Sequence, residues 1–203
     1  MARFTNQAQL RYGNAVTNSN IAVGEILEVL SATKTAVRNT YGQSDTVTYI
    51  VSIVNSGTTP ITGISVTDNL GEYTFGTTTL VPLTYIDGTV KYYVNGVLQP
   101  SAVVTAGPPL VVSGITVPAG GSVTVAYEAA VNEFAPLDTT SVINNTAIVA
   151  GTGITPITAE EEITVESTPV LTITKSVSPV PVTENGTLTY TFLIQNSGFN
   201  PPK

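Results

Sequence analysis

The stretch LSATKTAVRNTYGQSDTVTYIVSIVNSG, residues 30–57, decides the fold because it occurs twice in the chain. It returns without a gap as LTITKSVSPVPVTENGTLTYTFLIQNSG at residues 171–198. An internal repeat of this kind is typical of proteins built from tandem units. We therefore expect one complete unit in the middle of the chain, followed by the first two strands of a second unit. Such a chain is a segment of a longer array, or a subunit that another chain completes.

Composition excludes most enzyme classes. The 203 residues contain no His and no Cys, so His-based acid–base pairs, thiolate nucleophiles, zinc ribbons and disulfides are all absent. The net charge of −7 disfavours nucleic acid and anionic membranes as partners. No apolar run approaches the roughly 18 residues of a membrane span. We expect a non-enzymatic protein without cofactor or metal and without membrane insertion.

Alternating polar and apolar residues, rich in Thr, Val and Ile, predict short β-strands throughout. Gly, Pro and Asn-Gly turn signals separate the strands at spacings typical of an immunoglobulin-like antiparallel β-sandwich. Asp87-Gly88 and Asn95-Gly96 flank a KYYV run and predict an inserted β-hairpin at residues 84–98. The expected strands are 4–12, 15–23, 25–36, 46–54, 60–70, 110–117, 122–131, 141–150 and 154–165. We divide the chain into N-terminal strands (1–24), a complete repeat (25–167) and the start of a second repeat (168–203).

Three strands of the complete repeat carry a polar residue on the face that their neighbours mark as buried. Lys34 shares its face with Leu30 and Ala36, and Asp68 and Asn145 are placed in the same way among aliphatic residues. An unpaired buried charge is costly, so we expect the three side chains to meet in the core.

Two interpretations of this trio stay open. The first is a buried Lys34–Asp68 ion pair with Asn145 as a hydrogen-bonding neighbour. The second is a single-turnover, self-catalysed reaction: a desolvated, neutral Lys34 attacks the Asn145 carboxamide while Asp68 shuttles protons. Ammonia leaves, and a Lys34–Asn145 isopeptide bond closes a long loop, which stabilises a fold as a disulfide does.

The segments ITGISVTDNL, VPAGGSVTVAYEA and INNTAIV, together with the repeated stretch, resemble the bacterial conserved-repeat domain of unknown function that is number eleven of its naming series. The similarity spans roughly residues 26–166 and restarts at 170–198. It implies an immunoglobulin-like sandwich with adhesive, stalk or structural roles in large surface proteins of Gram-positive bacteria and some archaea. Surface modules similar to these form Lys–Asn isopeptide bonds assisted by an acid, a role that Lys34, Asp68 and Asn145 fit.

The N-terminal strand resembles the end of a repeat, since NQAQL (6–10) parallels NTAIV (145–149). Its inward face would carry Phe4, Asn6, Ala8, Leu10 and Tyr12. We therefore expect head-to-tail self-assembly, in which this strand complements the incomplete second repeat of another copy or of a neighbouring repeat. Lys175 is the counterpart of Lys34, but the second copy has no counterpart of Asp68. The opposing interpretation is that the N-terminal strands pack on their own domain.

The expected function is a structural module of a bacterial surface fibre, appendage or stalk, located outside the cell on a cell or spore surface. No signal-peptide pattern follows Met1, which leaves the export route open. The alternative function is an adhesin or binding module that recognises a glycan or a protein through its loops and the 84–98 hairpin.

Overall fold

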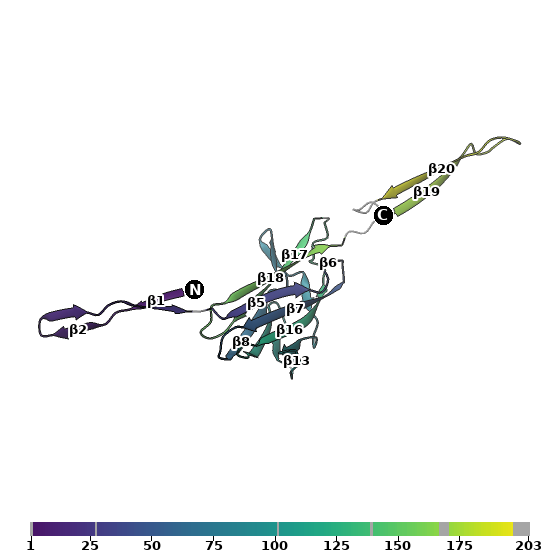
Figure 1. Cartoon of the computed structure of the whole chain (residues 1–203). Coiled ribbons are helices and arrows are strands. Elements are labelled where there is room, and N and C mark those ends of the chain that lie inside the picture. The colour runs from purple at the N-terminus through teal and green to yellow at the C-terminus, as the bar shows by residue number, and fades with distance from the viewer. Residues whose placement is uncertain (1, 27, 101, 139, 167–170, 197–203) are drawn as a thin grey trace.

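The computed structural model describes residues 2–26, 28–100, 102–138, 140–166 and 171–196. Within these ranges the chain forms strands and turns but no helix, so no helix that could span a membrane occurs there. The strands form a central sandwich of two sheets and two separate two-stranded ribbons, one near each end of the chain (Figure 1).

The first sheet has the order β13-β12-β16-β7-β5, and β11 also pairs with β16. Its longest pairing joins β7 and β16 antiparallel, with Tyr49 opposite Tyr127. The predicted hairpin is confirmed for residues 91–98, where Asn95 and Gly96, both with positive φ, join β12 and β13. Asp87-Gly88 does not form a second hairpin turn, because β11 and β12 each pair with β16 and not with one another. Its strands are β5 (Leu30–Ala36), β7 (Thr46–Asn55), β11 (Leu83–Tyr85), β12 (Lys91–Val94), β13 (Val97–Leu98) and β16 (Ser122–Val131).

The second sheet has the order β14-β15-β8-β17-β18-β6, and all its pairings are antiparallel except β18 with β6. Strands β8 and β17 lie side by side at its centre, with Asp68 opposite Ala147. Its strands are β6 (Thr40–Tyr41), β8 (Ile61–Asp68), β14 (Val103–Thr105), β15 (Leu110–Val117), β17 (Val142–Ala150) and β18 (Ile157–Val165). A small hairpin of β9 (Tyr73–Phe75) and β10 (Thr78–Leu80) follows β8.

The core lies between the two sheets because each long strand turns alternate residues inward. In β7 and β16 most of these residues are β-branched or aromatic, and they are buried along nearly the whole strand. Among the largest fully buried side chains are Tyr41, Tyr49, Tyr127, Ile53, Ile64, Leu83 and Ile163. The all-β sandwich expected from the alternation is therefore confirmed.

The N-terminal ribbon corrects three predicted strands, one of which is the expected strand 15–23, divided between β3 (Ala15–Asn18) and β4 (Ala22–Ile26). The expected strand 4–12 is divided into β1 (Ala2–Asn6) and β2 (Gln9–Tyr12), which pair with β4 and β3. The break is a bulge, since residues 19–21 lie opposite only residues 7 and 8, and Ser19 bonds Ala8 through both its backbone and its hydroxyl. The expected strand 25–36 is likewise two strands, β4 and β5, one in the ribbon and one in the sandwich.

The C-terminal ribbon consists of β19 (Leu171–Ser178) and β20 (Thr189–Asn196). It repeats the pairing of β5 and β7: Lys175 lies opposite Phe192, as Lys34 lies opposite Val51. The N-terminal ribbon in turn repeats the pairing of β17 and β18, since Asn6 lies opposite Ala22 as Asn145 lies opposite Glu161. The C-terminal ribbon thus has the register of β5 and β7. In the N-terminal ribbon, β1 and β4 have the register of β17 and β18, whereas β2 and β3 are shifted from it by one residue beyond the bulge.

Candidate functional site: a buried Lys–Asp–Tyr–Asn network

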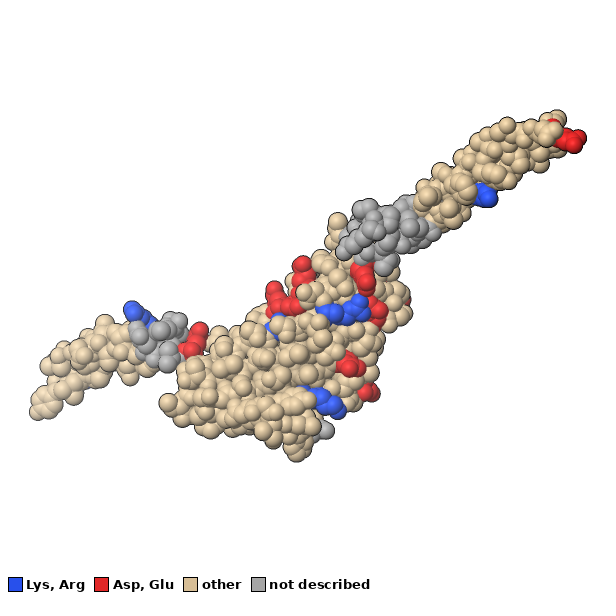
Figure 2. Space-filling view, turned by 45° about the vertical axis from the view of Figure 1, so that its right-hand side comes forward, with Lys and Arg blue, Asp and Glu red and all other residues tan. Residues whose placement is uncertain are grey.

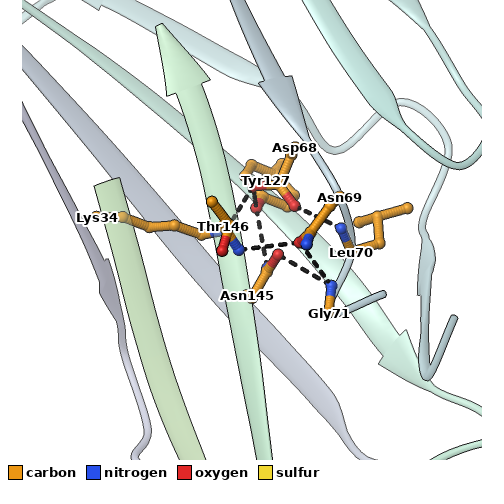
Figure 3. A network of polar contacts seen from close by, with 8 residues as sticks. All are labelled: Lys34, Asp68, Asn69, Leu70, Gly71, Tyr127, Asn145 and Thr146. Carbon is orange, nitrogen blue, oxygen red and sulfur yellow. Dashed lines mark hydrogen bonds and ion pairs between the residues drawn. The ribbon is translucent and has the colours of Figure 1, made fainter. Parts of the chain in front are cut away.

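The three polar residues singled out by the sequence lie together between the sheets. Lys34, Asp68 and Asn145 are 4%, 1% and 0% exposed. Lys34 comes from β5 at the edge of the first sheet, whereas Asp68 ends β8 and Asn145 lies on β17, both in the second sheet. Figure 3 shows the Lys34 side chain reaching from its own sheet toward the two residues of the other. A bond between Lys34 and Asn145 would therefore join the two sheets.

Asp68 is the centre of the network. Its Oδ2 accepts a hydrogen bond from Lys34 Nζ at 2.5 Å and another from the Tyr127 hydroxyl at 2.5 Å. Its Oδ1 accepts from the backbone N–H of Leu70 at 2.9 Å, as in an Asx-turn. The carboxylate is thus held by three donors in a region without exposed surface.

The Asn145 carboxamide is oriented by a partner at each end. Its Oδ1 accepts from the backbone N–H of Gly71 at 3.2 Å, and its Nδ2 donates to Tyr127 Oη at 3.4 Å. The opposite amide orientation would set an NH2 group against the Gly71 N–H, so the backbone fixes which end is which. The turn that follows β8 places this N–H, because Leu70 and Gly71 both have positive φ.

Burial changes the acid–base properties of the site. Desolvation lowers the pKa of Lys34 from 10.5 to about 8, against the opposing effects of the Asp68 charge and hydrogen bond and of the Glu161 charge. Burial, reinforced by the Asp68 charge, raises the pKa of Tyr127 well above 10. Near neutral pH the Tyr127 hydroxyl is therefore protonated and can both donate and accept, while Lys34 loses a proton more readily than an ordinary lysine.

Two stacked tyrosines lie at the network, and the sequence interpretation assigned neither of them to it. Tyr127 belongs to the network through its hydroxyl, whereas Tyr49 packs against it through its ring. The rings of Tyr49 and Tyr127 stack with centroids 5.7 Å apart, and Lys34 Nζ lies 4.9 Å from the Tyr49 centroid. The Tyr49 hydroxyl is buried and forms no hydrogen bond with the described residues. Burial raises the pKa of Tyr49, and the nearby Asn145 carboxamide opposes this rise only in part. The sequence did contain a signal for Tyr127. It lies on the inward face of β16, where the other inward residues are aliphatic, and a buried tyrosine hydroxyl usually needs a hydrogen-bond partner.

Glu161 was also missed. It lies on β18 beside Asn145, and its Oε1 accepts from the backbone N–H of Ala36 at 3.1 Å. This contact bridges the second sheet to β5 at the open edge of the sandwich.

The residues predicted for assembly lie elsewhere. Phe4, Leu10 and Tyr12 are exposed on the N-terminal ribbon, as are Asn6 and Ala8, and none of them packs in the core of the sandwich. Lys175 Nζ lies 4.4 Å from the centroid of the Tyr190 ring, which repeats the contact of Lys34 with Tyr49. Figure 2 shows few charged groups on either ribbon in that view.

Comparison with known proteins supports the fold. No model of a known protein family matches the sequence, so membership in the conserved-repeat family stays a prediction, and no curated protein matches either. The full-length major pilin SpaD from Corynebacterium diphtheriae has a TM-score of 0.50 at 16% identity, over 79% of this chain and 40% of the pilin. A variant of BcpA, the major pilin subunit of Bacillus cereus, has a TM-score of 0.50 at 9% identity, over 95% of this chain and 63% of the pilin.

The chain thus spans less than two thirds of the length of each of these pilins. At such low identities the likeness establishes the architecture and nothing finer. The chain is accordingly an all-β protein whose sandwich has the immunoglobulin-like fold of Gram-positive pilin domains.

Proposed function

We propose that this chain is a non-enzymatic structural module of a bacterial surface fibre, appendage or stalk, stabilised by an isopeptide bond between Lys34 and Asn145. The observation that carries the proposal is the convergence of an amine, a carboxylate and a carboxamide from opposite sheets in one desolvated network. In an ordinary stabilising role such a trio is weak, because a buried ion pair seldom stabilises a fold more than apolar residues do. Burying the Lys34 amine and the Asp68 carboxylate costs desolvation free energy, and formation of a covalent bond would give this costly arrangement a function.

The chemistry requires only residues of the site. Transfer of one proton from Lys34 Nζ to Asp68 Oδ2 leaves a neutral amine beside a neutral acid. The amine attacks Asn145 Cγ, the Cγ–Nδ2 bond breaks, and ammonia leaves as the new Nζ–Cγ amide forms. The reaction occurs once per chain, so the chain is not an enzyme in the sense of turnover.

Intact-protein mass spectrometry on boiled, denatured protein tests this proposal. We expect a mass lower by one ammonia and a cross-linked peptide that contains Lys34 and Asn145 after digestion. An unmodified mass would reduce the trio to a buried ion pair with an amide neighbour and would refute the covalent module.

We further propose that copies assemble head to tail through the two ribbons. The C-terminal ribbon and the β1–β4 part of the N-terminal ribbon repeat the register of two strands of the sandwich, and both ribbons leave exposed the face that the sandwich buries. Tyr190, Phe192 and Ile194 are 52–67% exposed, whereas their counterparts Tyr49, Val51 and Ile53 are fully buried. On the N-terminal ribbon, the exposed Phe4 and Leu10 correspond to the buried Ile143 and Val149. The apolar faces fit strands of the same fold, and the occupant we assign is a second copy of this chain.

Light scattering and electron microscopy of the full chain and of a variant without residues 1–12 test the assembly. We expect filaments or oligomers of the full chain and monomers of the deletion variant. Unchanged assembly after the deletion would refute strand complementation by the N-terminal ribbon. Monomers in both samples would favour neighbouring repeats of a longer chain as the partners. A place on a cell or spore surface follows from the fibre role and is part of the same proposal.

A further inference from the structure

The Asn145 carboxamide lies between two groups that differ in chemical character. Its oxygen faces a fixed backbone donor, the Gly71 N–H at 3.2 Å, and its nitrogen faces a hydroxyl, Tyr127 Oη at 3.4 Å. The same hydroxyl donates to Asp68 Oδ2 at 2.5 Å, the atom that also accepts from Lys34 Nζ. A continuous path of hydrogen bonds therefore runs from the attacking nitrogen through Asp68 and Tyr127 to the leaving nitrogen.

We propose that Tyr127 is the proton relay of the cross-linking reaction, carrying a proton from Asp68 to the departing Asn145 nitrogen, while the Gly71 N–H stabilises the oxyanion. This inference rests on the proposed isopeptide function and assigns the step that releases ammonia. Without a proton, the leaving group would be an amide anion, which no group at the site could stabilise.

The step balances in protons and bonds. Attack of the neutral Lys34 amine on Cγ forms the Nζ–Cγ bond and places negative charge on Oδ1, where the Gly71 N–H donates. In this tetrahedral intermediate Nδ2 becomes an amine with a free electron pair. The Tyr127 hydroxyl proton moves to Nδ2, and the proton of Asp68 moves to Tyr127 Oη. The Cγ–Nδ2 bond then breaks, the carbonyl re-forms, ammonia leaves, and Asp68 takes the surplus proton from Nζ.

The surroundings favour a relay through a neutral hydroxyl. Tyr127 is buried and stacked on Tyr49, so its ring is fixed and water does not replace its hydroxyl. Its raised pKa keeps the hydroxyl protonated before the reaction. The charged and titratable groups that face the site are Lys34 on β5, Tyr49 on β7, Asp68 on β8 and Glu161 on β18.

Tyr49 provides a matched control. It lies directly opposite Tyr127 on the neighbouring strand and is buried to the same degree, but its hydroxyl lacks a hydrogen-bond partner among the described residues. Tyr127→Phe and Tyr49→Phe therefore remove the same atom from the same stack, and only the first removes it from the proton path.

The test follows ammonia loss in the full-length chain. Unreacted chain is recovered in denaturant from insoluble material and diluted into buffer. Samples are then quenched and weighed by intact mass, while near-ultraviolet circular dichroism reports the folded fraction. We expect Tyr127→Phe to slow ammonia loss from the folded chain on the order of 10²-fold, and Tyr49→Phe to change it less than about threefold. Equal rates for the two variants would overturn the relay. A wild-type chain that never loses ammonia would instead refute the isopeptide function and remove the basis of both proposals.

A second measurement avoids any change of shape. Replacing tyrosine with 3-fluorotyrosine throughout the chain makes each hydroxyl more acidic and leaves the rings in place. We expect the wild-type sequence to lose ammonia about two- to tenfold faster, because the relay donates its proton more readily. The same replacement in the Tyr127→Phe chain should have no effect. An unchanged or slower wild-type rate would overturn the proposal even if Tyr127→Phe fails to fold.

Discussion

Replacing Asn145 with alanine removes the carboxamide that Lys34 is proposed to attack, while the Lys34–Asp68 ion pair stays in place. Closing a loop of roughly a hundred residues stabilises a fold by about 4–5 kcal/mol in the chain-entropy account of cross-links. The substitution also removes the hydrogen bonds to Gly71 and Tyr127, which contribute about 1–3 kcal/mol. We therefore expect Asn145→Ala to keep the unmodified mass and to unfold about 10–30 °C below the wild type.

Asn55 supplies the control for this measurement. It is a second fully buried asparagine, and its amide donates to the carbonyls of Thr59 and Pro118 while its Oδ1 accepts from the Gly57 N–H. Asn55→Ala should cost about 2–4 kcal/mol through lost hydrogen bonds and should leave the loss of ammonia intact. Thermal unfolding and intact mass are measured on both variants. If the wild type carries the bond and the two variants unfold within about 1 kcal/mol of each other, the cross-link does not stabilise the fold as reasoned here.

Three further outcomes are expected. Burial lowers the pKa of Lys34 from 10.5 to about 8 in the unbonded chain, and Asn145→Ala retains this burial together with Asp68 and Glu161, so the unfolded variant should bind more protons than the folded one between these values. Stability in denaturant titrations should rise from pH 8 to pH 10 by up to about 1.4 kcal/mol per unit, and a flat or falling profile would contradict the lowered pKa. Gly71→Ala should slow ammonia loss, because a Cβ at this position would meet Ile143 Cγ2 at 2.6 Å and displace the Gly71 N–H. Gly76→Ala is the control: Gly76 has a similar positive φ but lies in open space, so this substitution should only lower stability by about 1–2 kcal/mol. Equal rates in these two variants would argue against the oxyanion role. Arg38→Ala removes two half-exposed ion pairs, to Asp45 and to Glu166, and should lower the free energy of unfolding by less than about 1 kcal/mol. A larger loss would show that these two ion pairs have a structural role.

The repeat and the strand alternation determined much of this protein from sequence alone. Period-2 alternation placed Lys34, Asp68 and Asn145 on inward faces, because side chains in a strand alternate whatever its neighbours are. The turn signals gave the positions of most strands in the sandwich, including β15 and β16 at their observed bounds. They failed in the N-terminal ribbon, where Ser19 bonds back to Ala8 and interrupts a pattern that looks continuous in one dimension.

Only the tertiary structure decided what the inward residues touch. Which strands become neighbours depends on pairing between distant segments, and alternation carries no information about those partners. Tyr49 and Tyr127 look alike in sequence, each on the inward face of a long strand. Packing of the second sheet brings Asp68 and Asn145 to the hydroxyl of Tyr127, whereas the hydroxyl of Tyr49 finds no hydrogen-bond partner within the described part of the chain. The turn at Gly71 likewise acquires its role from β17, which lies beside it only in the folded chain.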